Sequence, residues 1–345
     1  MPSAEIKVAA VQIAPAFLDR EGSITRACEK IAEAGRAGAQ LVVFPEAFVP
    51  GYPDWIWVVP PGQRKLLNRL YGVLLDQSVA VPSAAVDRVR DAARDARVTV
   101  VLGINERNVE ASGGSIYNTV LVIGPDGGLI AKHRKLTPTG PERMVWAQGD
   151  GSTLGVWDTP VGRLSTLICW ENYMPLARYA MAAWGARIHA APTWDRGEPW
   201  ISTMRHVAKE GRVFVIGCCM ALRRSDIPND LEFAMLYPDG REWINGGDSL
   251  VVNPDGQIIA GPLHEAQGIL YADLPTELMD EPRWMFDAAG HYSRPDVFQL
   301  TVNREPRPMI AEGAGGSATT PHSARTRRPA RKTRRPSPRS RGGRR

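Results

Sequence analysis

Two stretches of the chain, residues 121–131 and 250–260, share one pattern. Each consists of two apolar runs joined by Pro-Asp-Gly, a tripeptide that favours a tight turn between antiparallel strands. A chain with two matching hairpins must contain β-sheet in both of its halves. The repeat therefore predicts two structurally similar halves.

Strand-like and helix-like segments alternate along the chain up to about residue 218. Short apolar runs are typical of buried strands, and longer amphipathic stretches are typical of helices. We expect strands at residues 6–14, 41–44, 98–104, 119–123, 162–168, 187–191 and 213–218, and helices at residues 22–38, 62–76, 83–97, 173–185 and 200–212. This alternation predicts an α/β protein with a mixed or parallel sheet.

The composition changes sharply near the C-terminus. Residues 313–345 hold 11 of the 42 Lys and Arg residues and no Asp or Glu, so the preceding 312 residues carry 31 basic against 37 acidic side chains. We expect residues 1–312 to form the folded domain and residues 313–345 to be a disordered basic tail, because the tail is too polar to bury a core. Contact of the tail with nucleic acid is the alternative, although the tail has no aromatic residue for base stacking.

The cysteines favour a reducing, cytoplasmic location. Cys28 and Cys169 stand alone and Cys218 and Cys219 are adjacent in an apolar run, so the spacing fits neither a disulfide framework nor a Cys-x-x-Cys metal site. The first residues form a charged strand-like run, unlike a signal peptide. No apolar run reaches the roughly 18 residues of a membrane span.

Cys169 follows an apolar strand-like run and precedes a helix-like stretch. A thiol at such a turn lies at a helix N-terminus, where the helix dipole and the free amide groups favour the thiolate. This is a suitable position for a nucleophile. The alternative is a small buried hydrophobic residue, which describes most free cysteines.

Two charged residues also follow strand-like runs. Glu46 comes after residues 41–44, and its apolar neighbours would desolvate the carboxylate and raise its pKa toward that of a general base. Lys135 follows a short strand and leads into a Pro-broken loop, where a cation can hold developing negative charge. On local sequence alone, a solvated loop glutamate and a solvated basic cluster are the simpler interpretations.

Four segments taken together resemble the nitrilase superfamily, whose members hydrolyse carbon–nitrogen bonds with a Glu–Lys–Cys triad. These segments are residues 44–46 (Phe-Pro-Glu), 134–139 (Arg-Lys-Leu-Thr-Pro-Thr), 169–172 (Cys-Trp-Glu-Asn) and 290–296 (Gly-His-Tyr-Ser-Arg-Pro-Asp). The resemblance covers roughly residues 5–303 and assigns the triad to Glu46, Lys135 and Cys169. It also implies that Glu142 is the family's further glutamate, which supports the lysine or the substrate.

The resemblance implies a four-layer αββα sandwich with two facing mixed sheets, with which the internal repeat agrees. The implied reaction is hydrolysis of an organic nitrile to the carboxylic acid and ammonia, through a covalent thioimidate and thioester on Cys169. This chemistry needs no metal and no organic cofactor. The family also assembles as homo-oligomers, in which dimers build larger spirals, so residues 52–80 and 222–247 are candidate interface segments.

The residues after Cys169 indicate the branch of the superfamily. Cys-Trp-Glu-Asn resembles the nitrilase branch, whereas amide-cleaving branches commonly carry Tyr and Asp there. Pro141, directly before Glu142, departs from the pattern of related microbial enzymes. An amidase or carbamoylase of the same superfamily and a cyanide-degrading enzyme remain the alternatives.

Large aromatic residues flank the segments expected near the site. They are Tyr52, Trp55, Trp57, Trp170, Trp194 and Trp200. We assign Tyr52, Trp170 and Trp194 to substrate binding, which would favour aryl or arylalkyl nitriles. Core packing and subunit contacts are the alternative roles for such residues.

Other enzyme classes find little support. Residues 247–250 (Gly-Asp-Ser-Leu) match an esterase signature, but a hairpin strand follows them instead of the helix expected after a nucleophile elbow. The six histidines show no His-x-x-x-His spacing, and there is neither a P-loop nor a Gly-x-Gly-x-x-Gly motif. A metal hydrolase and a nucleotide-binding protein are therefore disfavoured.

Overall fold

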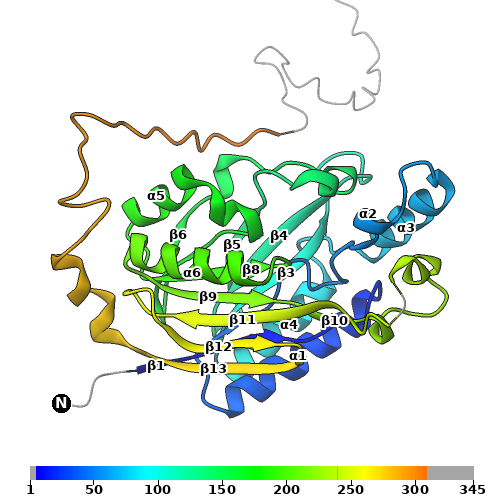
Figure 1. The fold of residues 1–345 in the computed structure, drawn as a ribbon, viewed down its shortest axis with the longest axis horizontal. Coiled ribbons are helices and arrows are strands. Elements are labelled where there is room, and N and C mark those ends of the chain that lie inside the picture. The colour runs from blue at the N-terminus through cyan, green and yellow to red at the C-terminus, as the bar shows by residue number, and fades with distance from the viewer. Residues whose placement is uncertain (1–4, 239, 309–345) are drawn as a thin grey trace, which may run out of the picture. The chain divides into compact units, whose positions relative to one another are not determined.

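The computed structural model describes residues 5–238 and 240–308 (Figure 1). The basic tail predicted at residues 313–345 lies outside the described residues. Within the part of the chain that is described, no helix combines the length and apolar character needed to cross a membrane.

The first sheet, within the described residues, has six strands in the order β13-β1-β2-β3-β4-β5. They are β1 (Glu5–Gln12), β2 (Leu41–Val43), β3 (Thr99–Arg107), β4 (Ile116–Ile123), β5 (Leu129–Arg134) and β13 (Gly268–Pro275). β1, β2 and β3 are parallel, with Val8, Leu41 and Thr99 in register, and the other pairings are antiparallel. The sheet is therefore mixed.

The second sheet repeats this arrangement with seven strands in the described residues, in the order β10-β11-β9-β8-β7-β6, and β12 pairs with β11. The strands are β6 (Val156–Thr159), β7 (Gly162–Thr166), β8 (Ile188–Thr193), β9 (Phe214–Cys219), β10 (Ala221–Arg223), β11 (Trp243–Val252) and β12 (Ile258–His264). β7, β8 and β9 are parallel, and their neighbours are antiparallel. Both sheets thus have a parallel centre and antiparallel edges.

Helices connect the parallel strands of each sheet. The α-helices are α1 (Arg20–Arg36), α2 (Trp55–Val58), α3 (Arg64–Gln77), α4 (Ala84–Ala96), α5 (Pro175–Ala183) and α6 (Glu198–Gly211). The short 3-10 helices are η1 (Gly140–Met144), η2 (Gly151–Thr153), η3 (Cys169–Tyr173), η4 (Arg224–Asp226), η5 (Glu232–Leu236), η6 (Thr276–Met279) and η7 (Glu281–Trp284). Each predicted strand and helix has a counterpart here, with ends that differ by a few residues.

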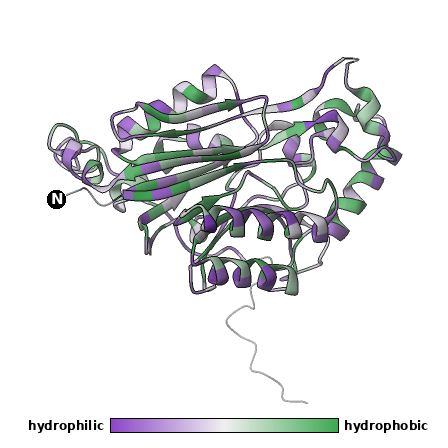
Figure 2. Cartoon of the chain, turned by 90° about the horizontal axis from the view of Figure 1, so that it is seen from below, coloured by the Kyte–Doolittle hydropathy of each residue, from purple (hydrophilic) through white to green (hydrophobic). Residues whose placement is uncertain are grey.

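The elements form four layers. α1 and α4 lie on one side of the two sheets, and α5 and α6 lie on the other (Figure 1). Ile24 of α1 and Val89 of α4 are buried against the first sheet, and Trp200 of α6 is buried against the second. Between the sheets, Val43 and Ile216 belong to a third buried cluster. Figure 2 shows helices banded purple and green, as expected of amphipathic helices with one buried face. The predicted αββα sandwich is confirmed.

The internal repeat extends to details of packing. The hairpins β4–β5 and β11–β12 turn at Gly127 and Gly256, whose φ angles are +78° and +81°. The carbonyl of Gly127 accepts a hydrogen bond from Arg90 of α4 at 2.7 Å, and that of Gly256 accepts one from Arg205 of α6 at 3.0 Å. A Cβ at either glycine would lie 2.9 Å from the main-chain oxygen of the same arginine. In each half, the same hydrogen bond and the same close approach of a glycine therefore hold the hairpin against its helix.

Candidate active site

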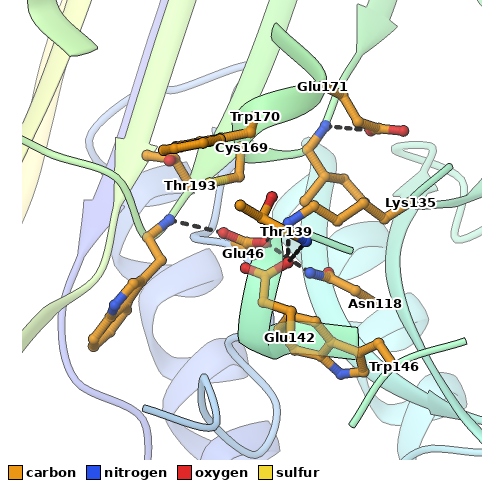
Figure 3. Close-up of polar contacts among 12 residues, drawn as sticks. Glu46, Asn118, Lys135, Thr139, Glu142, Trp146, Cys169, Trp170, Glu171 and Thr193 are labelled. Atoms are coloured by element: carbon orange, nitrogen blue, oxygen red, sulfur yellow. Dashed lines mark hydrogen bonds and ion pairs between the residues drawn. The ribbon is translucent and has the colours of Figure 1, made fainter. Parts of the chain in front are cut away.

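Three strand ends bring the predicted triad together. Glu46 lies just beyond β2 and Lys135 directly follows β5, both in the first sheet. Cys169 lies just beyond β7 in the second sheet. Their side chains meet in one buried cluster (Figure 3). The facing of the two sheets thus assembles a site that neither sheet contains alone.

Lys135 is the centre of this cluster. Its Nζ lies 2.7 Å from Oε1 of Glu46 and 2.8 Å from Oε2 of Glu142. All three residues are at most 2% exposed. Burial lowers the pKa of Lys135, but its interactions with the neighbouring acidic groups, Glu46 first, outweigh this and raise the pKa above its ordinary value. The ammonium is therefore charged at any physiological pH.

Every oxygen of the Glu46 carboxylate has a donor. Oε1 also accepts a hydrogen bond from Nδ2 of Asn118 at 2.7 Å, and Oε2 accepts one from the backbone N–H of Trp194 at 2.8 Å. Burial is the main cause that raises the pKa of Glu46, and Glu142 adds to it while Lys135 opposes it. A carboxylate that is held in place and has a raised pKa suits a general base.

Glu142 is fixed by the local structure of η1. It is the third residue of a capping box, in which its Oε2 accepts the backbone N–H of Thr139 at 2.7 Å. Its Oε1 accepts the hydroxyl of Tyr52 at 2.8 Å. Pro141 lies in the first turn of η1, where a missing N–H costs nothing. The unusual proline is therefore compatible with this geometry.

Cys169 is the first residue of η3, and its φ angle is +51°. A non-glycine residue in this left-handed region is strained, which is common where a side chain must point into a site. Burial raises the pKa of the thiol well above its ordinary value, Glu46 and Glu142 raise it further, and Lys135 and a hydrogen bond with Thr193 oppose the rise.

The expectation that a helix N-terminus favours the Cys169 thiolate is not met by the surroundings of the thiol. The α-helix α5 begins only at Pro175, and Cys169 itself begins the short 3-10 helix η3 that precedes it. Desolvation and two neighbouring carboxylates dominate instead. The resting thiol is therefore protonated, and a base must remove its proton.

A pocket of about 280 Å³ opens onto the thiol. Tyr52, Trp170 and Trp194, predicted to bind substrate, all line it, as do Cys169 and Glu142. The Tyr52 and Trp194 rings are stacked, with centroids 4.5 Å apart and planes at 3°. Trp170 is half-exposed. The pocket thus has aromatic walls and the cysteine on its surface.

The remaining aromatic candidates divide into two groups. Trp57 lines the pocket, and its Nε1 donates to the Tyr52 hydroxyl at 3.2 Å. Trp55 and Trp200 are buried in the core, at 1% and 0% exposure, and do not line it. The alternative interpretation of large aromatic residues as core therefore applies to these two.

Sequence reasoning missed several residues of the site. Asn118 and Thr193 contact the triad, and Asp195, Arg196 and Arg241 line the pocket. Asn118 was detectable in principle, because it is a polar residue inside the apolar strand β4. The others lie on loops or strand ends, where a polar residue carries no such signal.

Two further sequence features lie away from the cysteine. Ser249 of the esterase-like motif lies within β11 at 0% exposure, and its Oγ accepts the backbone N–H of Cys219 at 2.9 Å. It is a structural serine. Part of the motif at residues 290–296 lines a different, apolar cavity of about 610 Å³ beside α5 and α6, which none of the triad residues lines.

Known proteins with a similar sequence identify the family. Residues 7–283 match the carbon–nitrogen hydrolase family model. The chain belongs to the carbon–nitrogen hydrolase family.

Its curated relatives are nitrilases. The chain is 40% identical to an aliphatic nitrilase of Sinorhizobium fredii, over 90% of this chain and 99% of that protein. It is 39% identical to nitrilase 1 of Arabidopsis thaliana, over 90% of each chain. The predicted relationship to the nitrilase branch is confirmed.

Solved structures agree on the fold. A member of branch 10 of the nitrilase superfamily from Saccharomyces cerevisiae superimposes with a TM-score of 0.63 at 24% identity, covering 84% of this chain and 96% of that chain. An amidase from Nesterenkonia sp. gives a TM-score of 0.60 at 22% identity, covering 83% and 96%. At this identity the likeness concerns the fold alone.

Removing the shared cation should expose the cost of the buried carboxylates. We expect Lys135→Met to lower the free energy of unfolding by about 3–5 kcal/mol, because Glu46 and Glu142 are left buried, unpaired and facing each other. The deficit should shrink as the pH falls from neutral, because burial raises the pKa of Glu46 and the loss of Lys135 raises it further, so the folded variant binds a proton at Glu46 more readily than the unfolded chain. Urea denaturation at several pH values measures this.

Lys132→Met is the matched control. Lys132 pairs with Glu106, which is equally buried but keeps Arg134 as a second cationic partner. We expect a loss within about 1 kcal/mol and little pH dependence. Equal losses in the two variants would contradict the account of the Lys135 cluster.

Proposed function

We propose that this protein is a nitrilase that hydrolyses a small organic nitrile to the carboxylic acid and ammonia. The observation that carries the proposal is the 40% identity to an aliphatic nitrilase over 90% of this chain. The motif Cys-Trp-Glu-Asn at residues 169–172 supports the nitrile-cleaving rather than the amide-cleaving branch.

In the first proposed step, Glu46 accepts the Cys169 proton while the sulfur attacks the nitrile carbon. Proton transfer and attack are coupled, because the resting thiol is protonated. Glu46 then gives the proton to the nitrile nitrogen, and a thioimidate forms on Sγ. Lys135 and the backbone N–H of Trp170 stabilise the negative charge that develops on the nitrogen.

Two water molecules complete the proposed reaction. Glu46 deprotonates the first as it adds to the thioimidate carbon and passes this proton to the nitrogen, which gives a tetrahedral intermediate with one hydroxyl and one amino group. The hydroxyl proton then moves through Glu46 to the amino group, the carbon–nitrogen bond breaks, and ammonia leaves a thioester. The second water attacks the resulting thioester. The carbon–sulfur bond then breaks, which releases the carboxylic acid and restores the thiol. Earlier cleavage of the carbon–sulfur bond would release the amide.

The other site residues support this chemistry. Glu142 holds Lys135 in place through the 2.8 Å contact, and both of its oxygens are occupied, so it is assigned no proton transfer. Tyr52, Trp170 and Trp194 are proposed as the walls that orient the substrate above Cys169.

Ammonia release from a substrate panel tests the proposal. The panel contains a short aliphatic nitrile, phenylacetonitrile, cyanide and the matching amides. We expect the wild type to release ammonia from at least one organic nitrile, and Cys169→Ala to lower the rate by about 10⁴-fold or more, because the nucleophile is lost.

Cys28→Ala is the matched control, since Cys28 is a free thiol on α1 and is not a lining residue of the pocket. It should retain wild-type rates. Turnover of amides alone would move the protein to the amidase branch, and turnover of cyanide alone would make it a cyanide-degrading enzyme. Nitrile turnover that survives Cys169→Ala would refute the mechanism.

Assembly and location stay predictions. Met235, in the predicted interface segment at residues 222–247, is 79% exposed, which supports a subunit contact there. Light scattering of the purified chain measures the oligomeric state, and a monomer would contradict this assignment.

The free thiols support a reducing compartment such as the cytoplasm, and cell fractionation tests that location.

A further inference from the structure

Glu171 is a buried carboxylate that the proposed chemistry does not use. It lies on η3, two residues after Cys169, and is 1% exposed. A buried carboxylate is costly unless it is fully hydrogen-bonded. Its contacts therefore indicate why the chain keeps a charge at this position.

The Glu171 carboxylate binds both triad segments. Its Oε1 accepts the backbone N–H of Leu136 at 2.7 Å, and its Oε2 accepts the backbone N–H of Ile168 at 2.7 Å. Leu136 directly follows Lys135, and Ile168 directly precedes Cys169. One side chain thus joins the main chain beside the lysine to the main chain beside the nucleophile.

His133 completes the contacts of this carboxylate. Its Nε2 lies 3.0 Å from Oε2 of Glu171, and it belongs to β5, the strand that Lys135 directly follows. Burial raises the pKa of Glu171, but its interaction with His133 and the hydrogen bonds from the two backbone N–H groups outweigh this and lower the pKa below its ordinary value. Glu171 is therefore an ionised acceptor surrounded by donors.

Such a link matters because the two segments belong to different sheets. Lys135 follows β5 of the first sheet, and Cys169 follows β7 of the second. Ladder hydrogen bonds fix strands within a sheet, whereas the two facing sheets are joined by side-chain packing and by hydrogen bonds that involve side chains, such as that of Cys218 to the carbonyl of Val43. The separation of Lys135 from the strained Cys169 backbone therefore depends on contacts such as that of Glu171.

We propose that Glu171 is a positioning residue that sets the placement of Cys169 relative to Lys135 across the two sheets. It touches neither the substrate nor the reacting atoms, and acts through the backbone on either side. The inference rests on the proposed function in so far as nitrile turnover is one of its readouts.

Glu171→Gln tests the proposal. The carboxamide fills the same space, but its NH₂ group must face a backbone N–H or the histidine, so one link is lost. We expect kcat to fall by about 100-fold with KM within about threefold, because a displacement near 1 Å costs that much in rate. Alkylation of Cys169 by iodoacetamide, followed on its peptide by mass spectrometry, should slow by about 10-fold for the same reason.

Glu106→Gln is the matched control. Glu106 is 2% exposed and accepts from Thr119, Lys132 and Arg134, which all belong to the first sheet. Its loss should lower the free energy of unfolding at least as much as the loss of Glu171. We expect its kcat and the alkylation rate of Cys169 to stay within about threefold of wild type, because no link between the sheets is broken.

His133 provides a second test that does not depend on Glu171→Gln folding. His133→Leu removes the side-chain donor and leaves both backbone links, so kcat should fall by about 10-fold. His133→Gln keeps a donor and should restore most of this loss. Wild-type kcat and alkylation in Glu171→Gln, or in His133→Leu if the former does not fold, would overturn the proposal. Equal kinetic losses in Glu106→Gln would overturn it as well.

The alkylation readout separates this inference from the proposed function. Iodoacetamide reports the placement and proton transfer of Cys169 without any nitrile. If the wild type hydrolyses only amides, the same variants are compared on the amide. The proposed function then fails while the assignment of Glu171 is still tested.

Discussion

The ammonium of Lys135, shared by two buried carboxylates, is the interaction on which the rest of the site depends. Two carboxylates without a cation would be too costly to bury so close together. Lys135 lies between them, with its Nζ 2.7 Å from Glu46 and 2.8 Å from Glu142, and so holds both carboxyl groups in place. Burial, together with the neighbouring carboxyl groups, raises the pKa of the Cys169 thiol, so the proposed mechanism uses Glu46 as a base and does not need a preformed thiolate.

The sandwich supplies what this cluster requires. Strands of both halves of the repeat end at the site, and the two sheets bring the proposed base Glu46 and the proposed nucleophile Cys169 together from opposite layers. Glu46 and Lys135 are buried away from bulk solvent, whereas Cys169 faces a small aromatic pocket. The protein interior therefore sets the charges of Glu46 and Lys135, and Cys169 is the triad residue that lines the pocket. Glu171 is a further buried carboxylate between the layers, and its hydrogen bonds to the backbone on both sides can fix the placement of one sheet relative to the other.

Much of this was predictable from sequence, for local reasons. The Pro-Asp-Gly turns and the alternation of apolar and amphipathic segments gave the α/β class, and motif resemblance gave the sandwich and the order Glu46, Lys135, Cys169. The partners of these residues were not predictable, because Asn118 and the backbone N–H of Trp194 reach Glu46 only through tertiary packing. The prediction that the local turn favours the Cys169 thiolate was wrong for the same reason. The turn suggested an effect of the helix dipole, whereas burial and carboxyl groups from distant parts of the sequence raise the pKa of the thiol.

The most direct test of this account is the intact mass of the enzyme, acid-quenched during nitrile turnover, followed by peptide mapping. The account predicts an adduct on Cys169 with the added mass of the nitrile or of the corresponding acyl group, and none on Cys28. It further predicts that Glu46→Gln forms this adduct far more slowly than the wild type. Sustained nitrile turnover without an adduct on Cys169 at any quench time, or equal rates of adduct formation in Glu46→Gln, would contradict it.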